Sequence, residues 1–144
     1  MRQIALQIEV ERQIGDVWGL LADHERMAEW MPVREVVRRH PGGSGGNGVG
    51  AVRTIRTVES VVEEEITIFE PPELIEYVLK EGAPVRNYTG RVRLAALGET
   101  RAEIAWSVRF QPRLPGIGWL VERALRRRLE TGLDNLKRLL EASA

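Results

Sequence analysis

Alternating hydrophobic and polar positions predict a β-strand at the start of the chain. Every second residue from Ile4 to Val10 is aliphatic, and the residues between them are mostly polar. This period of two is typical of a sheet that is buried on one face and exposed to solvent on the other.

Residues 14–32 instead carry apolar side chains at helical spacing. They predict two short helices that break near Asp23, which is expected to cap the second.

The middle of the chain predicts six further strands joined mostly by short turns. A weakly patterned strand at 33–39 runs into the sequence HPGGSGGNGVG, where the density of glycine requires a loop. Short turns between consecutive strands imply antiparallel pairing. The other predicted strands are 49–57, 60–69, 74–80, 88–96 and 100–110.

A leucine-rich stripe predicts one long amphipathic helix over residues 116–142. At about 1.5 Å per residue this helix is about 39 Å long, enough to cross a whole sheet. A run of antiparallel strands with helices near both ends predicts an α+β fold whose helices cover one face of the sheet.

A carboxylate interrupts the apolar face of the strand VVEEEITIF. Val62, Ile66 and Ile68 form that face, and Glu64 lies among them at the same period. Because a buried charge needs a partner, Glu64 indicates that this face lines a partly hydrated cavity and that a base lies nearby.

The hairpin formed by strands 49–57 and 60–69 supplies that base. With Val58 and Glu59 at its tip, apolar residues meet apolar residues and the one acid meets an arginine. A shift by one residue would destroy this match. The predicted pairs are Thr57 with Ser60, Ile55 with Val62, Arg53 with Glu64, and Ala51 with Ile66.

Three roles are open for the predicted Arg53–Glu64 pair. It could fix the register of the hairpin as a structural ion pair. It could hold the polar group of a ligand in an otherwise apolar pocket. In the third, Glu64 transfers protons as a catalytic residue, although the neighbouring arginine opposes the rise in pKa that an apolar cavity would cause.

Aromatic residues complete the candidate site. Tyr77 and Tyr88 lie on the predicted inner face, where a buried hydroxyl needs a partner and could contact a ligand oxygen. Trp30, Trp106 and Phe110 are expected in or near the wall of the cavity.

Neither histidine predicts a metal site or a catalytic centre. His24 and His40 lack the spacing that supplies three metal ligands, and we expect His24 to be exposed at a helix start.

The glycine-rich loop 41–50 lacks the Gly-Lys-Ser/Thr ending of a phosphate-binding loop, so it is expected either to gate the cavity mouth or to be a simple connection. Arg126, Arg127 and Arg128 are expected on a solvated face of the long helix.

Composition limits the remaining function classes. The 144 residues, 43% hydrophobic and 29% charged, are expected to form a single ligand-binding domain over 1–144. A net charge of zero argues against nucleic acid as a partner, and no apolar run reaches the length of a membrane span. The chain has no cysteine and opens without the apolar core of a secretory signal, so we expect a cytoplasmic protein.

The order of these elements resembles the SRPBCC or START-like helix-grip superfamily, and within it the polyketide cyclase/dehydrase and lipid transport family. The resemblance implies a curved seven-stranded antiparallel sheet wrapped around the C-terminal helix, with two short helices between the first two strands. The stretches that carry it are VWGLLADHERMAEWMP (17–32), GVGAVR (48–53), ITIFEPPELIEYVL (66–79), PVRNYTGRVRL (84–94), TRAEIAWSVRF (100–110), LPGIGWL (114–120) and GLDNLKRLLE (132–141).

The same resemblance implies a role in binding a small hydrophobic ligand, of the lipid, quinone or polyketide/aromatic type, in an internal cavity between the sheet and the C-terminal helix. The alternative it implies is a polyketide cyclase or dehydratase in which Glu64 or a tyrosine moves protons. A third possibility is an interaction module that modulates another protein. We expect no cofactor, no metal and no stable membrane insertion, and a homodimer is compatible with the sequence.

Overall fold

The computed structural model describes residues 1–142 as seven strands, two α-helices and one 3₁₀ helix, η1. Residues 143–144, the end of the predicted domain, lie outside the described residues. In chain order the elements are β1 (Arg2–Val10), α1 (Ile14–Leu21), η1 (His24–Glu29), β2 (Glu35–His40), β3 (Val52–Arg56), β4 (Val61–Glu70), β5 (Leu74–Glu81), β6 (Val85–Ala96), β7 (Ala102–Pro112) and α2 (Gly118–Ala142).

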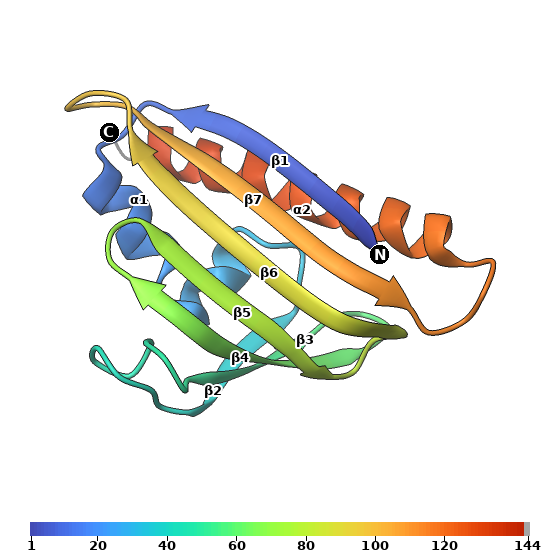
Figure 1. Ribbon diagram of the computed structural model, residues 1–144. Helices are drawn as coiled ribbons and strands as arrows, with labels where there is room; N and C mark the ends of the chain where they lie inside the picture. Colours follow the sequence, from blue (N-terminus) through green and yellow to red (C-terminus); the bar gives the residue numbers. More distant parts are fainter. Residues whose placement is uncertain (143–144) are drawn as a thin grey trace.

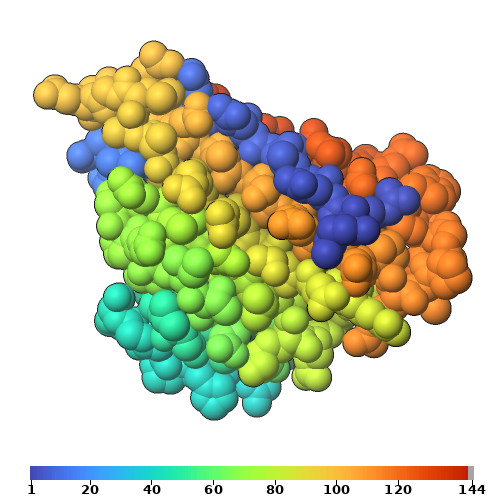
Figure 2. Space-filling model, in the orientation of Figure 1, coloured from blue at the N-terminus to red at the C-terminus, as the bar shows by residue number. Residues whose placement is uncertain are grey.

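All seven strands form one antiparallel sheet in the order β1-β7-β6-β5-β4-β3-β2. Strands that follow one another from β2 to β7 are also neighbours, and the sheet is completed by β1 pairing with β7. The helices lie together on one face, with α2 running along β1 and β7 (Figure 1). The outer face in Figure 2 carries side chains of the strands. This confirms the predicted α+β fold, in which a curved seven-stranded sheet wraps around a long C-terminal helix.

The second predicted short helix differs from expectation. It is a 3₁₀ helix, η1, and Asp23 precedes it without making the side-chain capping bond that was predicted. The backbone carbonyl of Asp23 instead accepts from the Arg26 N–H at 3.0 Å, the i→i+3 bond typical of this tighter helix. The capping prediction was therefore wrong in its chemistry.

The C-terminal half of α2 supplies the solid core. Leu129, Leu133, Leu136 and Leu140 are all buried, at a spacing that places them on one stripe of the helix. Burying a leucine side chain stabilises a fold by about 1.5–3 kcal/mol. This stripe therefore anchors α2 to the sheet.

Gly132 lets the end of η1 approach α2 closely. A Cβ at this position would lie 2.8 Å from the Met31 sulfur, closer than side chains normally pack. Next to this contact, Asn135 Nδ2 donates to the Trp30 carbonyl at 3.0 Å. The two contacts fix η1 against the helix and define one wall of the space described below.

Gly90 on β6 performs the same role inside the sheet. It pairs with Tyr77 on β5, and the Tyr77 ring lies directly over it. A Cβ at Gly90 would overlap that ring, so only glycine leaves room for the tyrosine to lie across β6.

We predict that Gly90→Ala destabilises the protein by about 1–3 kcal/mol, because the buried Tyr77 ring must move to admit a methyl group. Equilibrium urea denaturation measures the change. Gly19→Ala is the matched control: Gly19 is exposed in α1 with open space around it, so alanine should stabilise the helix by about 0.5–1 kcal/mol. Equal stability of Gly90→Ala and the wild type would contradict the packing described for Tyr77.

Candidate ligand-binding cavity

A cavity of about 320 Å³ lies between the concave face of the sheet, η1 and the N-terminal half of α2. This volume is near the lower end of the range of about 300–1,000 Å³ that small-molecule sites occupy. Its walls are mostly apolar. Those apolar residues include Met27, Met31, Ile55, Val62, Leu79, Val121, Leu125 and Leu129.

The mouth of the cavity is marked by the lining residues that are exposed to solvent. These are Gly82 and Pro84 in the turn between β5 and β6, and Ala124 on α2. Residues 41–50 are not among the lining residues, so the glycine-rich loop does not border the mouth as one of our predictions had it. That loop instead supports the site from behind, through His24.

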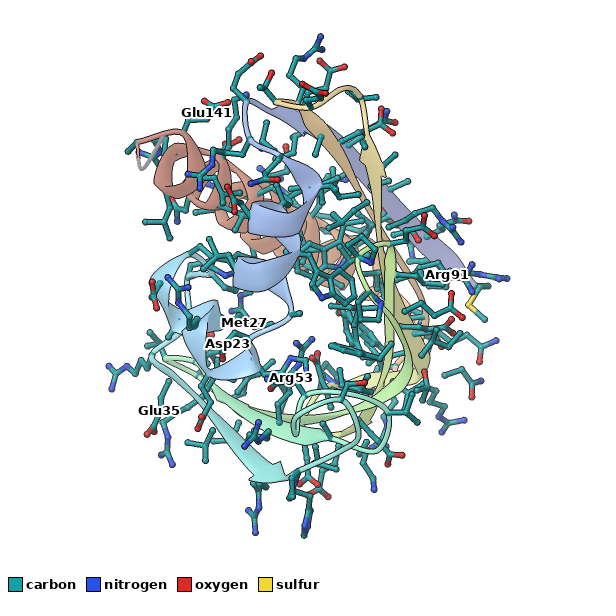
Figure 3. All side chains as sticks on the ribbon, turned by 90° about the vertical axis from the view of Figure 1, so that its left-hand side faces the viewer. Asp23, Met27, Glu35, Arg53, Arg91 and Glu141 are labelled. Carbon is teal, nitrogen blue, oxygen red and sulfur yellow. The ribbon has the colours of Figure 1, made fainter. Side chains whose placement is uncertain are left out.

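Arg53 and Glu64 form a buried ion pair on the cavity wall. They are paired across β3 and β4, as Ile55 and Val62 are, so the predicted register is confirmed. Arg53 Nε donates to Glu64 Oε1 at 2.9 Å, and Nη2 lies 2.8 Å from the same oxygen. Their side chains are only 4% and 9% exposed. Figure 3 shows Arg53 directed into the space between the sheet and η1, near Met27, whereas Arg91 stands on the outer face.

His24 is buried rather than exposed, so that prediction was wrong. Its Nδ1 lies 3.2 Å from Arg53 Nη1, and its Nε2 lies 2.7 Å from the Asn47 carbonyl. A guanidinium can only donate, so Nδ1 must accept and Nε2 must carry the hydrogen that Asn47 accepts. His24 therefore links the glycine-rich loop to Arg53. No local signal in the stretch DHERM reveals this, because both partners are more than twenty residues away.

The neutral form of His24 is favoured inside the protein. Burial, and then the charge of Arg53, lower the pKa of this imidazole from 6.5 to about 4. At neutral pH, Arg53 is thus the charged member of this pair, and His24 adds no second positive charge.

Tyr77 lies at the centre of the polar end of the cavity. Its ring stacks under the Arg53 guanidinium, with 4.8 Å from Cζ to the ring centroid. Its hydroxyl accepts from Trp106 Nε1 at 2.9 Å, a contact that spans β6 and depends on Gly90. Burial, and then the charge of Glu64, raise the pKa of Tyr77, so it is a neutral phenol.

Tyr88 reaches the cavity because β6 is irregular at this point. The register of β6 against β7 shifts between Arg86 and Thr89, and Asn87 adopts a φ of 52°, a left-handed conformation that asparagine tolerates. The Tyr88 ring lies 6.3 Å from that of Tyr77. Burial raises the pKa of Tyr88 well above its usual value.

The structure brings five of the seven predicted residues together. Arg53, Glu64, Tyr77, Tyr88 and Trp106 all line the cavity. The other two lie directly behind these residues, in the core.

Those two are Trp30 and Phe110, both almost fully buried. Trp30 meets Trp106 edge-on, with ring centroids 5.9 Å apart. Phe110 packs 6.3 Å from the Tyr88 ring. They support wall residues rather than form the wall.

Sequence reasoning placed the cavity against the C-terminal helix but did not name the helical residues that line it. Met27 and Met31 come from η1 and the turn after it, and Val121 and Leu125 come from α2. Their helical spacing predicted burial but could not separate a cavity wall from a core. Arg128, expected on a solvated face, also lines the cavity and lies 3.7 Å from the Glu59 carboxylate at the tip of the β3–β4 hairpin.

A family described as polyketide cyclase/dehydrase and lipid transport matches residues 1–141. The chain belongs to this family. No curated protein matches it.

Solved structures share the fold at low sequence identity. A START superfamily protein from Mycobacterium smegmatis is 15% identical, with a TM-score of 0.85 and 99% of each chain covered. The di-domain ARO/CYC protein BexL of the BE-7585A biosynthetic pathway is 16% identical, with a TM-score of 0.79 over 96% of this chain and 46% of that one.

Norcoclaurine synthase from Thalictrum flavum, solved with dopamine and hydroxybenzaldehyde, is also similar. It is 16% identical, with a TM-score of 0.73, and the match covers 96% of this chain and 85% of the synthase. At these identities the likeness shows the fold alone. Within residues 1–142, no helix has the length and apolar character required to span a bilayer, and no cluster of three or more His, Asp or Glu side chains is placed to hold a metal ion.

We predict that His24 makes the free energy of unfolding decrease as the pH falls below 6.5. Because its folded pKa of about 4 lies below the unfolded value of 6.5, only the unfolded chain gains a proton between these values. The free energy of unfolding should therefore fall by roughly 3 kcal/mol from this group as pH drops from 6.5 to 4. Denaturant titrations at several pH values measure the fall against His24→Gln, in which this component is absent.

The matched control is His40→Gln, since His40 is exposed. This variant should keep the full acid dependence of the wild type. If the free energy of unfolding of His24→Gln fell with pH in parallel with that of the wild type, the buried imidazole would not be the cause of the acid dependence.

Proposed function

We propose that this protein binds one small, mainly apolar molecule in the cavity between its sheet and α2. The observation that carries the proposal is the cavity itself: about 320 Å³ of space with apolar walls and a cluster of buried polar groups at one end. Sites of this composition bind a ligand by apolar contact and orient it by a few polar groups. The proposed polar contacts are Glu64, Tyr77 and Tyr88, with Arg53 holding Glu64 in place, and Trp106 is part of the wall.

Family and fold support this role. The family description includes lipid transport, and the norcoclaurine synthase structure holds two small aromatic molecules. The cavity volume favours a ligand of one to a few rings over a lipid with two long acyl chains. Such a ligand would reach the site through the mouth between the β5–β6 turn and α2.

The proposal predicts that filling the cavity abolishes binding without unfolding the protein. Leu125 lines the cavity and is only partly buried, so Leu125→Trp should place an indole in the ligand's space. Native mass spectrometry of protein purified gently from its own organism should show a bound mass that leaves on unfolding, and Leu125→Trp should lose it.

Thr131→Trp is the matched control, because Thr131 is exposed on the same helix. This variant should carry the same mass as the wild type. If Leu125→Trp also kept the full amount of bound mass, the ligand would lie elsewhere and the proposal would fail.

A second candidate function, cyclisation or dehydration of a polyketide-like chain, is favoured by one observation. Glu64 is a buried residue that lines the cavity, and one oxygen of its carboxylate has no hydrogen-bond donor among the described residues. A carboxylate held in this way is a suitable general base. Tyr77 and Tyr88, both neutral, would be the groups that carry protons.

This second function predicts that Glu64→Gln lowers the rate at which a poly-β-ketone thioester is converted to a cyclic product by about a hundredfold or more. The loss should exceed any change in affinity for the same thioester. Glu65→Gln is the control, since Glu65 pairs with Lys80 on the opposite face of β4. Absence of product with the wild-type protein would rule out the activity for this substrate class and leave binding as the function.

A further inference from the structure

The polar end of the cavity presents a hydrogen-bond acceptor rather than a receptor for anions. We propose that the cavity selects uncharged ligands whose hydroxyl group donates a hydrogen bond to Glu64, and that it disfavours carboxylates of the same size. The proposal rests on the proposed binding function and names the chemical class of the ligand: a small alcohol or phenol with an apolar body.

Arg53 is the arginine that contacts Glu64, and its charge is already used. Arg128 also lines the cavity, but it lies beside the Glu59 carboxylate at the hairpin tip, at 3.7 Å. Arg53 Nε and Nη2 both contact Glu64 Oε1, at 2.9 Å and 2.8 Å. Nη1 faces His24 Nδ1 at 3.2 Å, and the face of the guanidinium lies on the Tyr77 ring. A ligand carboxylate could recruit this cation only by displacing Glu64, which would leave a second carboxylate without its partner in a buried site.

The second oxygen of Glu64 has no hydrogen-bond donor among the described residues. Within residues 1–142, Oε2 accepts no hydrogen bond, since both contacts from Arg53 go to Oε1. The fully buried side-chain atoms without a partner are Trp30 Nε1 and Thr54 Oγ1, and Oε2 is not one of them. Because Glu64 lines the cavity, this unpartnered oxygen is the atom of Glu64 that would accept from a donor bound there.

The tyrosines favour a hydroxyl over a simple donor such as an ammonium group. Tyr77 and Tyr88 are neutral and line the cavity beside Glu64. A ligand hydroxyl donates one hydrogen bond and accepts others, so it can satisfy the carboxylate and contact a phenol together. A carboxylate ligand only accepts, and it would meet Glu64 as a like charge in a site of low dielectric.

Three naphthalenes that differ at one substituent test the proposal. 2-Naphthol donates and accepts, 2-methoxynaphthalene only accepts, and 2-naphthoate is an anion near neutral pH. Isothermal titration of the wild-type protein should give an affinity for 2-naphthol about tenfold higher than for 2-methoxynaphthalene, as expected of a hydrogen bond to a charged group. 2-Naphthoate should bind most weakly.

Glu64→Gln separates recognition by Glu64 from the general cost of placing an anion in an apolar cavity. Removal of the carboxylate frees the Arg53 charge, so the affinity for 2-naphthoate should rise about tenfold or more while that for 2-naphthol falls. Where this variant does not fold, Arg53→Met combined with Glu64→Leu removes both charges and leaves neither unpaired. In that double variant 2-naphthol should lose its advantage over 2-methoxynaphthalene. Glu65→Gln, on the outer face, should bind all three as the wild type does.

The outcomes distinguish this inference from the function on which it rests. Equal binding of 2-naphthol and 2-methoxynaphthalene, or tighter binding of 2-naphthoate by the wild type, would overturn the selectivity but leave a working apolar cavity. If Leu125→Trp retained the binding of all three, or if none of the three bound the wild type, the binding function proposed for this cavity would itself be overturned. An advantage of 2-naphthol that survives in the double variant would also overturn the role assigned to Glu64.

Discussion

The buried ion pair between Arg53 and Glu64 is the constraint on which the rest of this structure depends. Each charge loses several kcal/mol of hydration on burial, and the pair recovers this only where the geometry is good and further hydrogen bonds are made. Two guanidinium contacts to one carboxylate oxygen, the neutral His24 and the face of Tyr77 supply that environment. The contacts of this one pair and of His24 therefore connect β3 and β4 with β5, η1 and the loop carbonyl of Asn47.

This requirement explains why one helix has two different halves. From Leu129 onward, α2 buries a leucine stripe against the sheet and behaves as an ordinary core helix. In the N-terminal half of α2, Val121 and Leu125 line the cavity instead. The opposite wall carries polar groups, and aliphatic side chains packed directly against them would offer these groups no hydrogen-bond partners. The cavity thus results from keeping polar groups satisfied at one end of a sheet whose other end is packed solid.

Local pairing could be predicted from the sequence, whereas placement in three dimensions could not. The Arg53–Glu64 register follows from period-two patterns within a single hairpin, and the structure confirms it. His24 was placed on the surface because its burial depends on Asn47 and Arg53, which lie more than twenty residues away. Trp30 and Phe110 were placed in or near the wall and lie just behind it, because only the curvature of the sheet separates a wall residue from a core residue.

The fold and family do not decide between carrier and enzyme, since relatives that are 15–16% identical share the sheet and helix without fixing the side chains in the cavity. The polar cluster narrows the choice. Glu64, paired with Arg53, can accept a hydrogen bond or a proton, while the phenols of Tyr77 and Tyr88 keep their protons. A bound hydroxyl of ordinary acidity would therefore only be held. If the ligand instead has an acidic C–H group beside a carbonyl, Glu64 can remove that proton as a base. The acidity of the ligand therefore determines whether this geometry binds or catalyses.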